Sequence, residues 1–167
     1  MALQLTKIAS TTVATPAASI DFSSIPSGYT DLILKISTRG TDNAIYNDTY
    51  LKFNNDGTGA NYGYRYIRGT GSAANSSSGT SLYIGEGTGS AATSNTFCNL
   101  EIYIPNYTSS NYKSSSIDIV GENNGTEAYT HLTARLWSST SAINQITIYP
   151  GSGSYVANST ATLYGVL

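Results

Sequence analysis

The chain has 167 residues and a formal net charge of −2, from eight Lys and Arg residues against ten Asp and Glu residues. This length fits one domain spanning residues 1–167, because ordinary domains hold roughly 100 to 200 residues. Only 11% of the residues are charged, against a usual ~25%. So few cations, scattered between Lys7 and Arg135, exclude the basic patch that nucleic-acid binding requires.

Neither a membrane-spanning segment nor a secretory signal is predicted. No apolar run approaches the ~20 residues that a spanning helix needs, and Met1 to Ser10 lacks a basic segment followed by an apolar one. The single cysteine, Cys98, lies in an apolar, strand-like run and is expected to be a small buried hydrophobic residue. We therefore expect assembly in a cytoplasm and a fold that needs no disulfide, metal or cofactor.

The first predicted element is the N-terminal segment from Met1 to Val13, in which Leu3, Leu5 and Ile8 provide the apolar positions. Two interpretations stay open for it. The segment is either an ordinary first strand of its own sheet or an arm that adds a strand to the sheet of a neighbouring protein.

Strict alternation of apolar and polar residues marks two further strands. In residues 30–39, Leu32, Leu34 and Ile36 fall on one face, which is typical of a half-buried strand. Residues 96–104 follow the same pattern, and Pro105 ends this strand because proline cannot donate to a sheet ladder. The apolar face of the second strand is expected to hold Cys98, Leu100, Ile102 and Ile104.

Fourteen tyrosines stand out in a chain with three phenylalanines and one tryptophan. In the run from Asn61 to Tyr66, alternation places Tyr62, Tyr64 and Tyr66 on one face. Because tyrosine joins a broad apolar ring to a polar tip, an exposed face of this kind would suit a sugar or a neighbouring subunit. A buried face would be part of the core, and the pattern does not choose between the two.

The loops are rich in Gly, Ser, Thr and Asn. The hexapeptide GTGSAA occurs twice, at residues 69–74 and 87–92, and is interpreted as linker sequence because no helix follows it to complete a phosphate-binding turn. The segment Asn54 to Gly57 is typical of a turn whose residues tolerate a positive φ. A calcium loop would need more alternating acidic residues.

Further alternating runs bring the total to nine or ten predicted strands of about five residues each. Because helical patterns are nearly absent, we expect an all-β fold, a two-sheet antiparallel sandwich with jelly-roll-like connections. The other runs are Ile117 with Ile119, Leu132 with Ala134 and Leu136, Ile146 with Ile148, Ala161 with Leu163, and the weaker segments 49–54, 62–68 and 81–85.

No catalytic constellation is recognisable. His131 is the only histidine, and alternation places it beside Thr133 and Arg135 on a strand, which suits a structural or interface residue. The ten carboxylates contain no pair that the sequence singles out for glycoside hydrolysis. We therefore expect a protein that is not an enzyme.

Three stretches are similar to a known group of proteins. Residues 19–40 contain the order I-P-x-x-Y-x-D-L, residues 51–69 contain F-N-x-D, and residues 143–167 close on L-Y-G. This order resembles a loosely defined group of bacteriophage virion proteins that includes capsid decoration proteins and fibre-associated proteins. No catalytic residue comes with the resemblance.

The resemblance implies a structural protein of the virion, most readily a capsid decoration (cement) protein. Its partners would be the major capsid protein or other virion proteins, and it would itself form a homo-oligomer, a trimer being favoured. Binding is expected through Tyr62, Tyr64 and Tyr66 and through Leu3, Leu5 and Ile8. The alternative is a receptor- or carbohydrate-binding module of a phage tail or fibre, whose partner is a host surface glycan.

Overall fold

The computed structural model describes residues 4–167, which form twelve strands and one short 3-10 helix at Gly59–Asn61. None of the helical structure in this range is long or apolar enough to cross a membrane. The strands are β1 (Leu5–Thr12), β2 (Ile20–Phe22), β3 (Asp31–Thr38), β4 (Tyr46–Phe53), β5 (Tyr62–Gly69), β6 (Ala74–Thr80), β7 (Tyr83–Thr88), β8 (Cys98–Ile104), β9 (Lys113–Gly121), β10 (Tyr129–Trp137), β11 (Ile146–Pro150) and β12 (Thr160–Val166).

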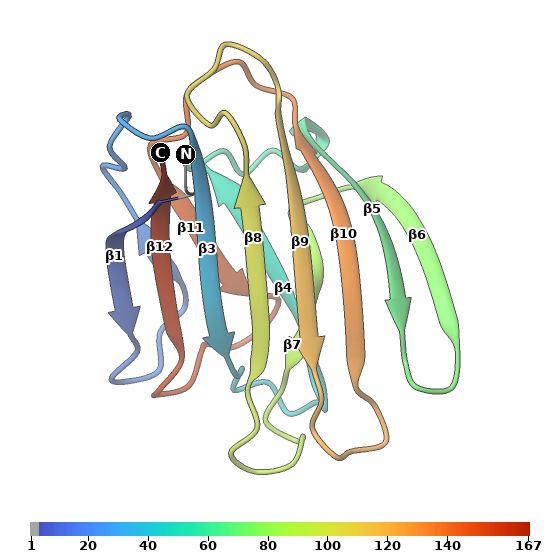
Figure 1. Cartoon of the computed structure of the whole chain (residues 1–167). Coiled ribbons are helices and arrows are strands. Elements are labelled where there is room, and N and C mark those ends of the chain that lie inside the picture. The colour runs from blue at the N-terminus through green and yellow to red at the C-terminus, as the bar shows by residue number, and fades with distance from the viewer. Residues whose placement is uncertain (1–3) are drawn as a thin grey trace.

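The strands form two antiparallel sheets packed face to face (Figure 1). The larger sheet has the order β1-β12-β3-β8-β9-β10-β5-β6, and the smaller has the order β2-β11-β4-β7. The chain passes repeatedly from one sheet to the other, which agrees with the predicted two-sheet antiparallel sandwich. The predicted count of nine or ten strands was low, since β2 has three residues and β6 (ANSSSGT) has no apolar alternation.

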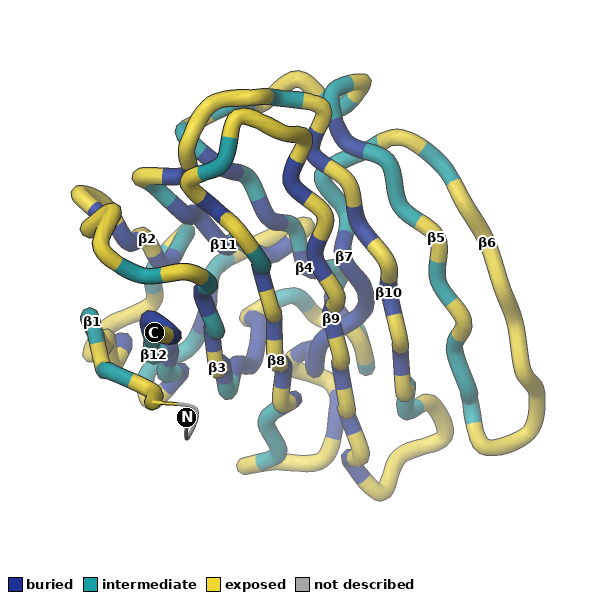
Figure 2. Tube along the Cα trace, turned by 45° about the horizontal axis from the view of Figure 1, so that its top comes forward, coloured by how far each residue is buried: buried dark blue, intermediate teal, exposed yellow. Residues whose placement is uncertain are grey.

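The core lies between the sheets and confirms the alternation of the predicted strands. Leu32, Leu34 and Ile36 of β3 are buried, and so is the Cys98 face of β8. Figure 2 shows buried and exposed residues alternating along β8, β9 and β10 of the larger sheet. The core therefore rests on inward-facing Ile, Leu and Phe side chains, as period-two patterning requires.

The larger sheet extends beyond the smaller one at one side. Strand β7 is the last strand of the smaller sheet, whereas β5 and β6 continue the larger sheet past it (Figures 1 and 2). We call this β5–β6 extension the overhang. All but one of the β6 residues are exposed, because no second sheet covers them.

Strand β10 buries the face opposite to its leucines. Leu132 is 55% exposed, while His131, Thr133 and Arg135 point inward and are buried. Thr133 donates a hydrogen bond to the carbonyl oxygen of Ile84 at 3.1 Å, and the Arg135 guanidinium donates to the carbonyls of Leu82, Tyr83 and Leu51 at 2.8–3.1 Å. Polar side chains are needed on this face because the edge of β7 presents backbone carbonyls that would otherwise be buried without partners.

Candidate functional site

An open hollow lies where the smaller sheet ends beneath the overhang. Its volume is about 340 Å³, which is within the size range of small-ligand sites. We call it the tyrosine groove, because four tyrosines and two carboxylates surround it: it is lined by Asp48, Tyr50, Tyr64, Tyr66, Ser81, Tyr83 and Glu86.

Strands β4 and β7 form one wall of the groove through their outward positions. Asn47, Thr49 and Leu51 of β4 are buried, so the alternate residues Asp48 and Tyr50 face outward. Cross-strand pairing then sets Asp48 opposite Glu86 and Tyr50 opposite Tyr83. The chain thus brings two acidic and two aromatic side chains together within one antiparallel pair.

A break in the β4–β7 register makes this pairing possible. Thr49 pairs with Gly85, but the next residue, Tyr50, pairs with Tyr83, which leaves Ile84 as an extra residue. Such a bulge redirects neighbouring side chains. Gly85 has a φ of +149°, and a Cβ there would lie 2.4 Å from a methyl group of Ile119, so this position accepts glycine only.

The four tyrosine rings are connected through contacts of Tyr83 with each of the other three. Tyr64 and Tyr66 stack with centroids 6.0 Å apart and planes 8° from parallel. Tyr83 approaches Tyr64 edge-on at 5.6 Å and lies 6.1 Å from Tyr50. These separations are within the range of favourable aromatic pairs, so the rings form a continuous aromatic wall.

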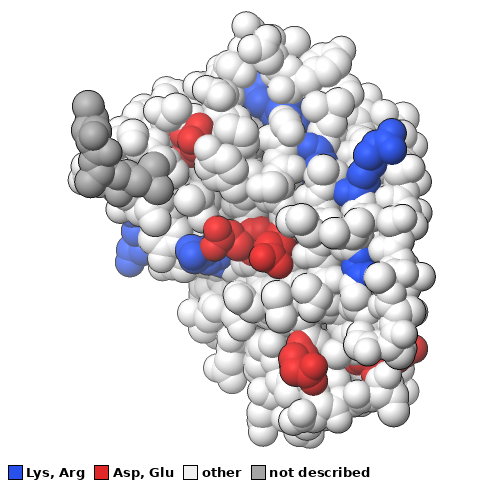
Figure 3. Space-filling view, turned by 45° about the vertical axis from the view of Figure 1, so that its right-hand side comes forward, with Lys and Arg blue, Asp and Glu red and all other residues white. Residues whose placement is uncertain are grey.

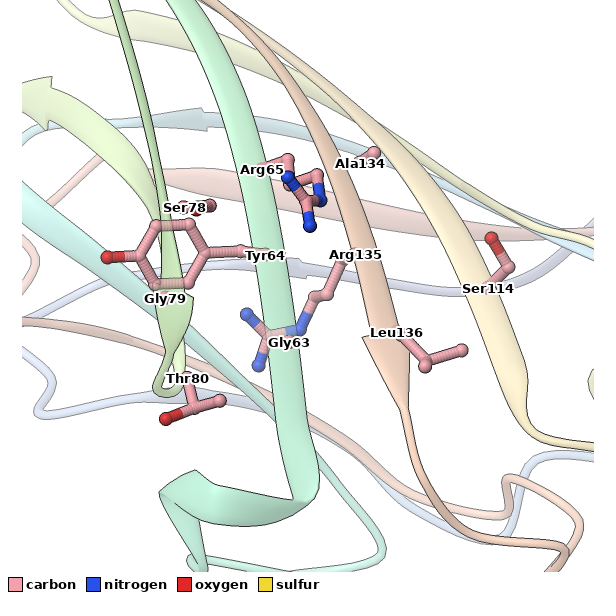
Figure 4. A pocket seen from close by; sticks show the side chains of 10 residues that line it. All are labelled: Gly63, Tyr64, Arg65, Ser78, Gly79, Thr80, Ser114, Ala134, Arg135 and Leu136. Carbon is pink, nitrogen blue, oxygen red and sulfur yellow. The ribbon is translucent and has the colours of Figure 1, made fainter.

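Gly79 of β6 makes room for the Tyr64 ring. The two residues are cross-strand partners, and a Cβ on Gly79 would lie 2.8 Å from the Tyr64 hydroxyl oxygen. In Figure 4 the ring lies against β6 beside Gly79. The absence of a side chain at Gly79 thus lets Tyr64 lie flat across the overhang.

A buried charge cluster lies beneath the aromatic wall. Glu86 contacts Arg68 through Oε1 and Nε2 of His131 through Oε2. The His131 side chain is fully buried, and that of Glu86 is 7% exposed. Arg68 and His131 in turn contact Tyr66 and Tyr129, at centroid distances of 5.0–6.1 Å. The cluster therefore fixes both β7 and the tyrosines above it.

The two carboxylates of the groove have opposite pKa shifts. Burial acts to raise the pKa of Glu86, but hydrogen bonding and the positive charges of His131 and Arg68 outweigh it, so the pKa of Glu86 is lowered. Burial, followed by repulsion from Glu86, raises the pKa of Asp48. Like charges on directly opposed residues of a sheet repel each other, so this acidic pair is maintained at a cost in stability.

The three tyrosines predicted on one face of β5 do lie on one face, but they have different surroundings. Tyr62 is fully buried, and its hydroxyl accepts a hydrogen bond from the Phe53 backbone N–H at 3.0 Å. Tyr64 and Tyr66 are half-buried and line the groove. Tyr62 is therefore part of the core, whereas Tyr64 and Tyr66 reach an open surface.

Of the apolar residues predicted to bind near the N-terminus, Leu5 and Ile8 are not part of the groove. Leu3 lies outside the described residues. Leu5 is 45% exposed and Ile8 packs partly against the core, both within β1. Strand β1 pairs antiparallel with β12, so this segment is the first strand of its own sheet. Its addition to a neighbour's sheet stays a prediction for the remaining edge of β1.

A second hollow, of about 460 Å³, crosses the overhang and the adjacent part of the larger sheet (Figure 4). Five of its ten lining residues are glycine, serine or threonine, and Tyr64 is the one aromatic residue among the ten. The residues are Gly63, Tyr64, Arg65, Ser78, Gly79, Thr80, Ser114, Ala134, Arg135 and Leu136.

The segment from Asn54 to Gly57 is a turn, as predicted. Asn54 and Asn55 have positive φ values of 49° and 58°. Asp56 accepts a hydrogen bond from the Trp137 indole at 2.9 Å, and this bond is the main reason that the pKa of Asp56 falls to about 2. Within residues 4–167 no group of three or more His, Cys, Asp and Glu side chains is arranged to hold a metal ion.

Sequence reasoning missed five residues of the groove, namely Asp48, Tyr50, Ser81, Tyr83 and Glu86. A signal for Asp48 and Tyr50 was present, because alternation places Tyr46, Asp48 and Tyr50 on one face. No local signal pairs them with Tyr83 and Glu86, because the register shift decides that contact.

Comparisons with known proteins identify no family for this chain. No protein-family model matches it, and no curated protein matches it. One similar solved structure is the galectin LEC-6 of Caenorhabditis elegans, with 9% sequence identity, 95% coverage of both chains and a TM-score of 0.40. Identity and similarity of this size do not establish a shared ligand.

Proposed function

We propose that this chain is a carbohydrate-binding module and that the tyrosine groove is its sugar site. The observation that carries the proposal is the joint lining of one open hollow by Tyr50, Tyr64, Tyr66 and Tyr83 with the carboxylates of Asp48 and Glu86. Tyrosine offers a rigid apolar face at a low entropic cost. The Asp48 carboxylate can accept strong hydrogen bonds from hydroxyl groups.

The proposed mechanism is binding without bond cleavage. Opposed carboxylates can serve glycoside hydrolysis when one acts as an acid and the other as a base or nucleophile. In this groove, however, both oxygens of Glu86 are already engaged by Arg68 and His131. This arrangement suits an anchor for the aromatic wall more than a group that attacks a substrate.

The virion is the proposed setting of this activity, as a receptor-binding module of a phage tail or fibre. The support for this setting is the sequence resemblance of residues 19–40, 51–69 and 143–167. In this role the groove would hold a glycan of the host surface. Several copies in one particle would multiply a weak affinity through avidity.

Capsid decoration is the second candidate function. It is favoured by the same resemblance and by apolar side chains on the outer face of the larger sheet. Ile67 and Leu132 are direct cross-strand partners there and are 60% and 55% exposed. An exposed apolar pair of this kind suits contact with another virion protein or with further copies in a homo-oligomer, for which a trimer stays the prediction.

The first experiment tests the sugar site on a glycan array and by calorimetry. The double variant Tyr64→Ala/Tyr66→Ala should lose binding while keeping the wild-type melting temperature to within a few degrees. Tyr112→Ala is the matched control, since Tyr112 is 57% exposed and lies outside the groove. If the wild-type protein binds no glycan, the proposed sugar site is wrong. If the bound glycan is cleaved, the proposed mechanism of binding without cleavage is wrong.

A second experiment separates the two candidates. The purified protein is mixed with undecorated capsids of its source virus, and bound copies are counted after sedimentation. Saturation at a ratio that matches a symmetry position of the shell supports decoration. Absence of capsid binding together with glycan binding supports the receptor-binding module.

A further inference from the structure

The tyrosine groove continues into an adjoining hollow along the outer side of β4. This adjoining hollow has a volume of about 300 Å³, and it shares Asp48 and Tyr50 with the groove. Its remaining lining residues are Asp42, Ala44, Tyr46, Asn47, Gly151 and Ser152. The shared residues make the two hollows halves of one elongated site.

The adjoining hollow ends on another aromatic residue. Tyr46 is 38% exposed, and its ring is held edge-on against Tyr129 at a centroid distance of 5.2 Å. Tyr46, Asp48 and Tyr50 occupy alternate positions of one strand and therefore follow one line. Tyr64 lines the groove and not the adjoining hollow, whereas Tyr46 lines the adjoining hollow and not the groove, so a ligand that contacts both must span the two hollows.

Two hydrogen bonds, one with the β4 backbone and one with the Asn47 side chain, hold the segment of Gly151 and Ser152 against β4. Gly151 donates a hydrogen bond to the Asp48 carbonyl at 2.7 Å, and the Asn47 amide donates to the Ser152 carbonyl at 3.0 Å. A Cβ on Gly151 would lie 2.9 Å from the Asp48 Cβ and 3.0 Å from the Tyr50 ring. Glycine at this position keeps the passage between the two hollows open.

Two carboxylates along this site have no ion-pair partner among residues 4–167, namely those of Asp42 and Asp48. The third carboxylate, that of Glu86, contacts Arg68 and His131 beneath the rings. Figure 3 shows that charged side chains on the visible face form small patches separated by neutral surface. An anionic ligand would therefore meet uncompensated carboxylates, whereas a ligand rich in hydroxyl groups would meet acceptors.

We infer that the site takes a neutral oligosaccharide of at least two sugar units and discriminates against acidic sugars. This inference rests on the proposed function and specifies its ligand class. One unit occupies the tyrosine groove, between Tyr64 and Asp48. The next unit lies over Tyr50 and extends toward Tyr46 and the segment of Gly151 and Ser152.

The length of the ligand is tested with a glycan array that carries neutral oligosaccharides from monosaccharide to hexasaccharide, followed by calorimetry on the ligands that bind. Tyr64→Ala is expected to weaken binding of every length about ten-fold, the equivalent of losing one aromatic contact. Tyr46→Ala should weaken the longer ligands by a similar factor and leave monosaccharide binding unchanged.

Three results would each contradict a different part of the proposal. If Tyr46→Ala leaves all lengths unaffected, the two-unit site is wrong while the sugar site stands. If every length binds with equal affinity, the ligand occupies one hollow only. If no saccharide binds, the proposed function itself fails.

The charge selectivity is tested with matched oligosaccharides in which a uronic acid replaces a neutral sugar. Wild-type protein should bind the acidic ligand at least ten-fold more weakly than the neutral one. Asp42→Asn should reduce this discrimination several-fold, because the amide removes the negative charge of Asp42 and keeps one acceptor oxygen. Tighter binding of the acidic ligands by the wild-type protein would overturn the inference.

Discussion

The two sides of the sandwich have different interiors. Where the smaller sheet covers the larger one, the inward residues are apolar, as for Leu34 of β3 and Ile102 of β8. Where the smaller sheet ends, the inward residues become His131, Arg135 and the tyrosines of β5. On both sides of the sandwich, inward and outward residues alternate along each strand. The two sides differ in the groups that the inward side chains contact.

This contrast explains how a site arises without a dedicated loop. On the covered side, inward side chains meet other apolar side chains and need only fill space. At the overhang they meet the backbone edge of β7 and solvent, which call for hydrogen-bond donors and amphipathic rings. A sheet that extends past its partner therefore produces a polar, aromatic recess next to an apolar core.

The largest expected effect distinguishes two neighbouring tyrosines of one strand. Tyr62→Ala should lower the free energy of unfolding by about 3–5 kcal/mol, because it opens a cavity in the core. It also removes a ring stacked on Trp137 and a hydrogen-bond acceptor of Phe53. Tyr64→Ala should cost about 1 kcal/mol or less. Chemical denaturation checks both, and equal losses would contradict the assignment of Tyr62 to the core and Tyr64 to the groove.

The next effect concerns the charge cluster beneath the overhang. Glu86→Gln should destabilise the protein by about 3 kcal/mol near neutral pH, because His131 and Arg68 lose a buried partner. The matched control is Glu101→Gln on the outer face of β8, whose ion pair with Lys35 is about half exposed and is therefore expected to contribute little to stability.

The pH dependence of the Glu86 effect follows from the direction of its shift. Since the folded-state pKa of Glu86 is lowered, its stabilisation is present above the usual carboxyl pKa and is lost as the pH falls through the folded-state value. The difference between wild type and Glu86→Gln should therefore narrow in acid. Denaturation series at several pH values measure this, and a constant difference would argue against the ion-pair explanation.

A smaller effect of opposite sign is expected at Asp48. The pKa of Asp48 is raised, so its contribution favours folding at low pH and is lost as the pH rises through the folded-state value. Asp48→Asn should therefore make the protein more stable than wild type at neutral pH, and this gain should vanish well below the ordinary carboxyl pKa of about 4. A variant that is less stable than wild type at pH 7 would contradict the repulsion between Asp48 and Glu86.

The smallest expected effect on stability comes from the overhang hairpin. Gly79→Ala should displace the Tyr64 ring and weaken glycan binding several-fold, with little change in melting temperature. Gly63→Ala is the control, because a Cβ there meets no atom within 4 Å. Unchanged glycan binding by Gly79→Ala would show that the position of Tyr64 against β6 does not matter for the ligand.

Two identical hexapeptides show how far local sequence goes. GTGSAA at residues 69–74 forms the exposed turn between β5 and β6, where Gly71 has a φ of +82°. The copy at residues 87–92 begins as the buried end of β7, and its Ser90 and Ala92 carbonyls accept hydrogen bonds from Arg39, both at 2.9 Å. Distant partners decide between the two structures, because the local preferences are the same.

The sequence alone determined the all-β sandwich, the burial of Leu32, Leu34 and Ile36, and the common face of Tyr62, Tyr64 and Tyr66. Period-two alternation suffices for these features because it states which residues share a face. It does not state what lies opposite that face. Only the tertiary structure decided that β10 buries His131 and Arg135 instead of its leucines, and that a bulge in β7 brings Tyr83 and Glu86 to Tyr50 and Asp48, because these contacts depend on where the second sheet ends.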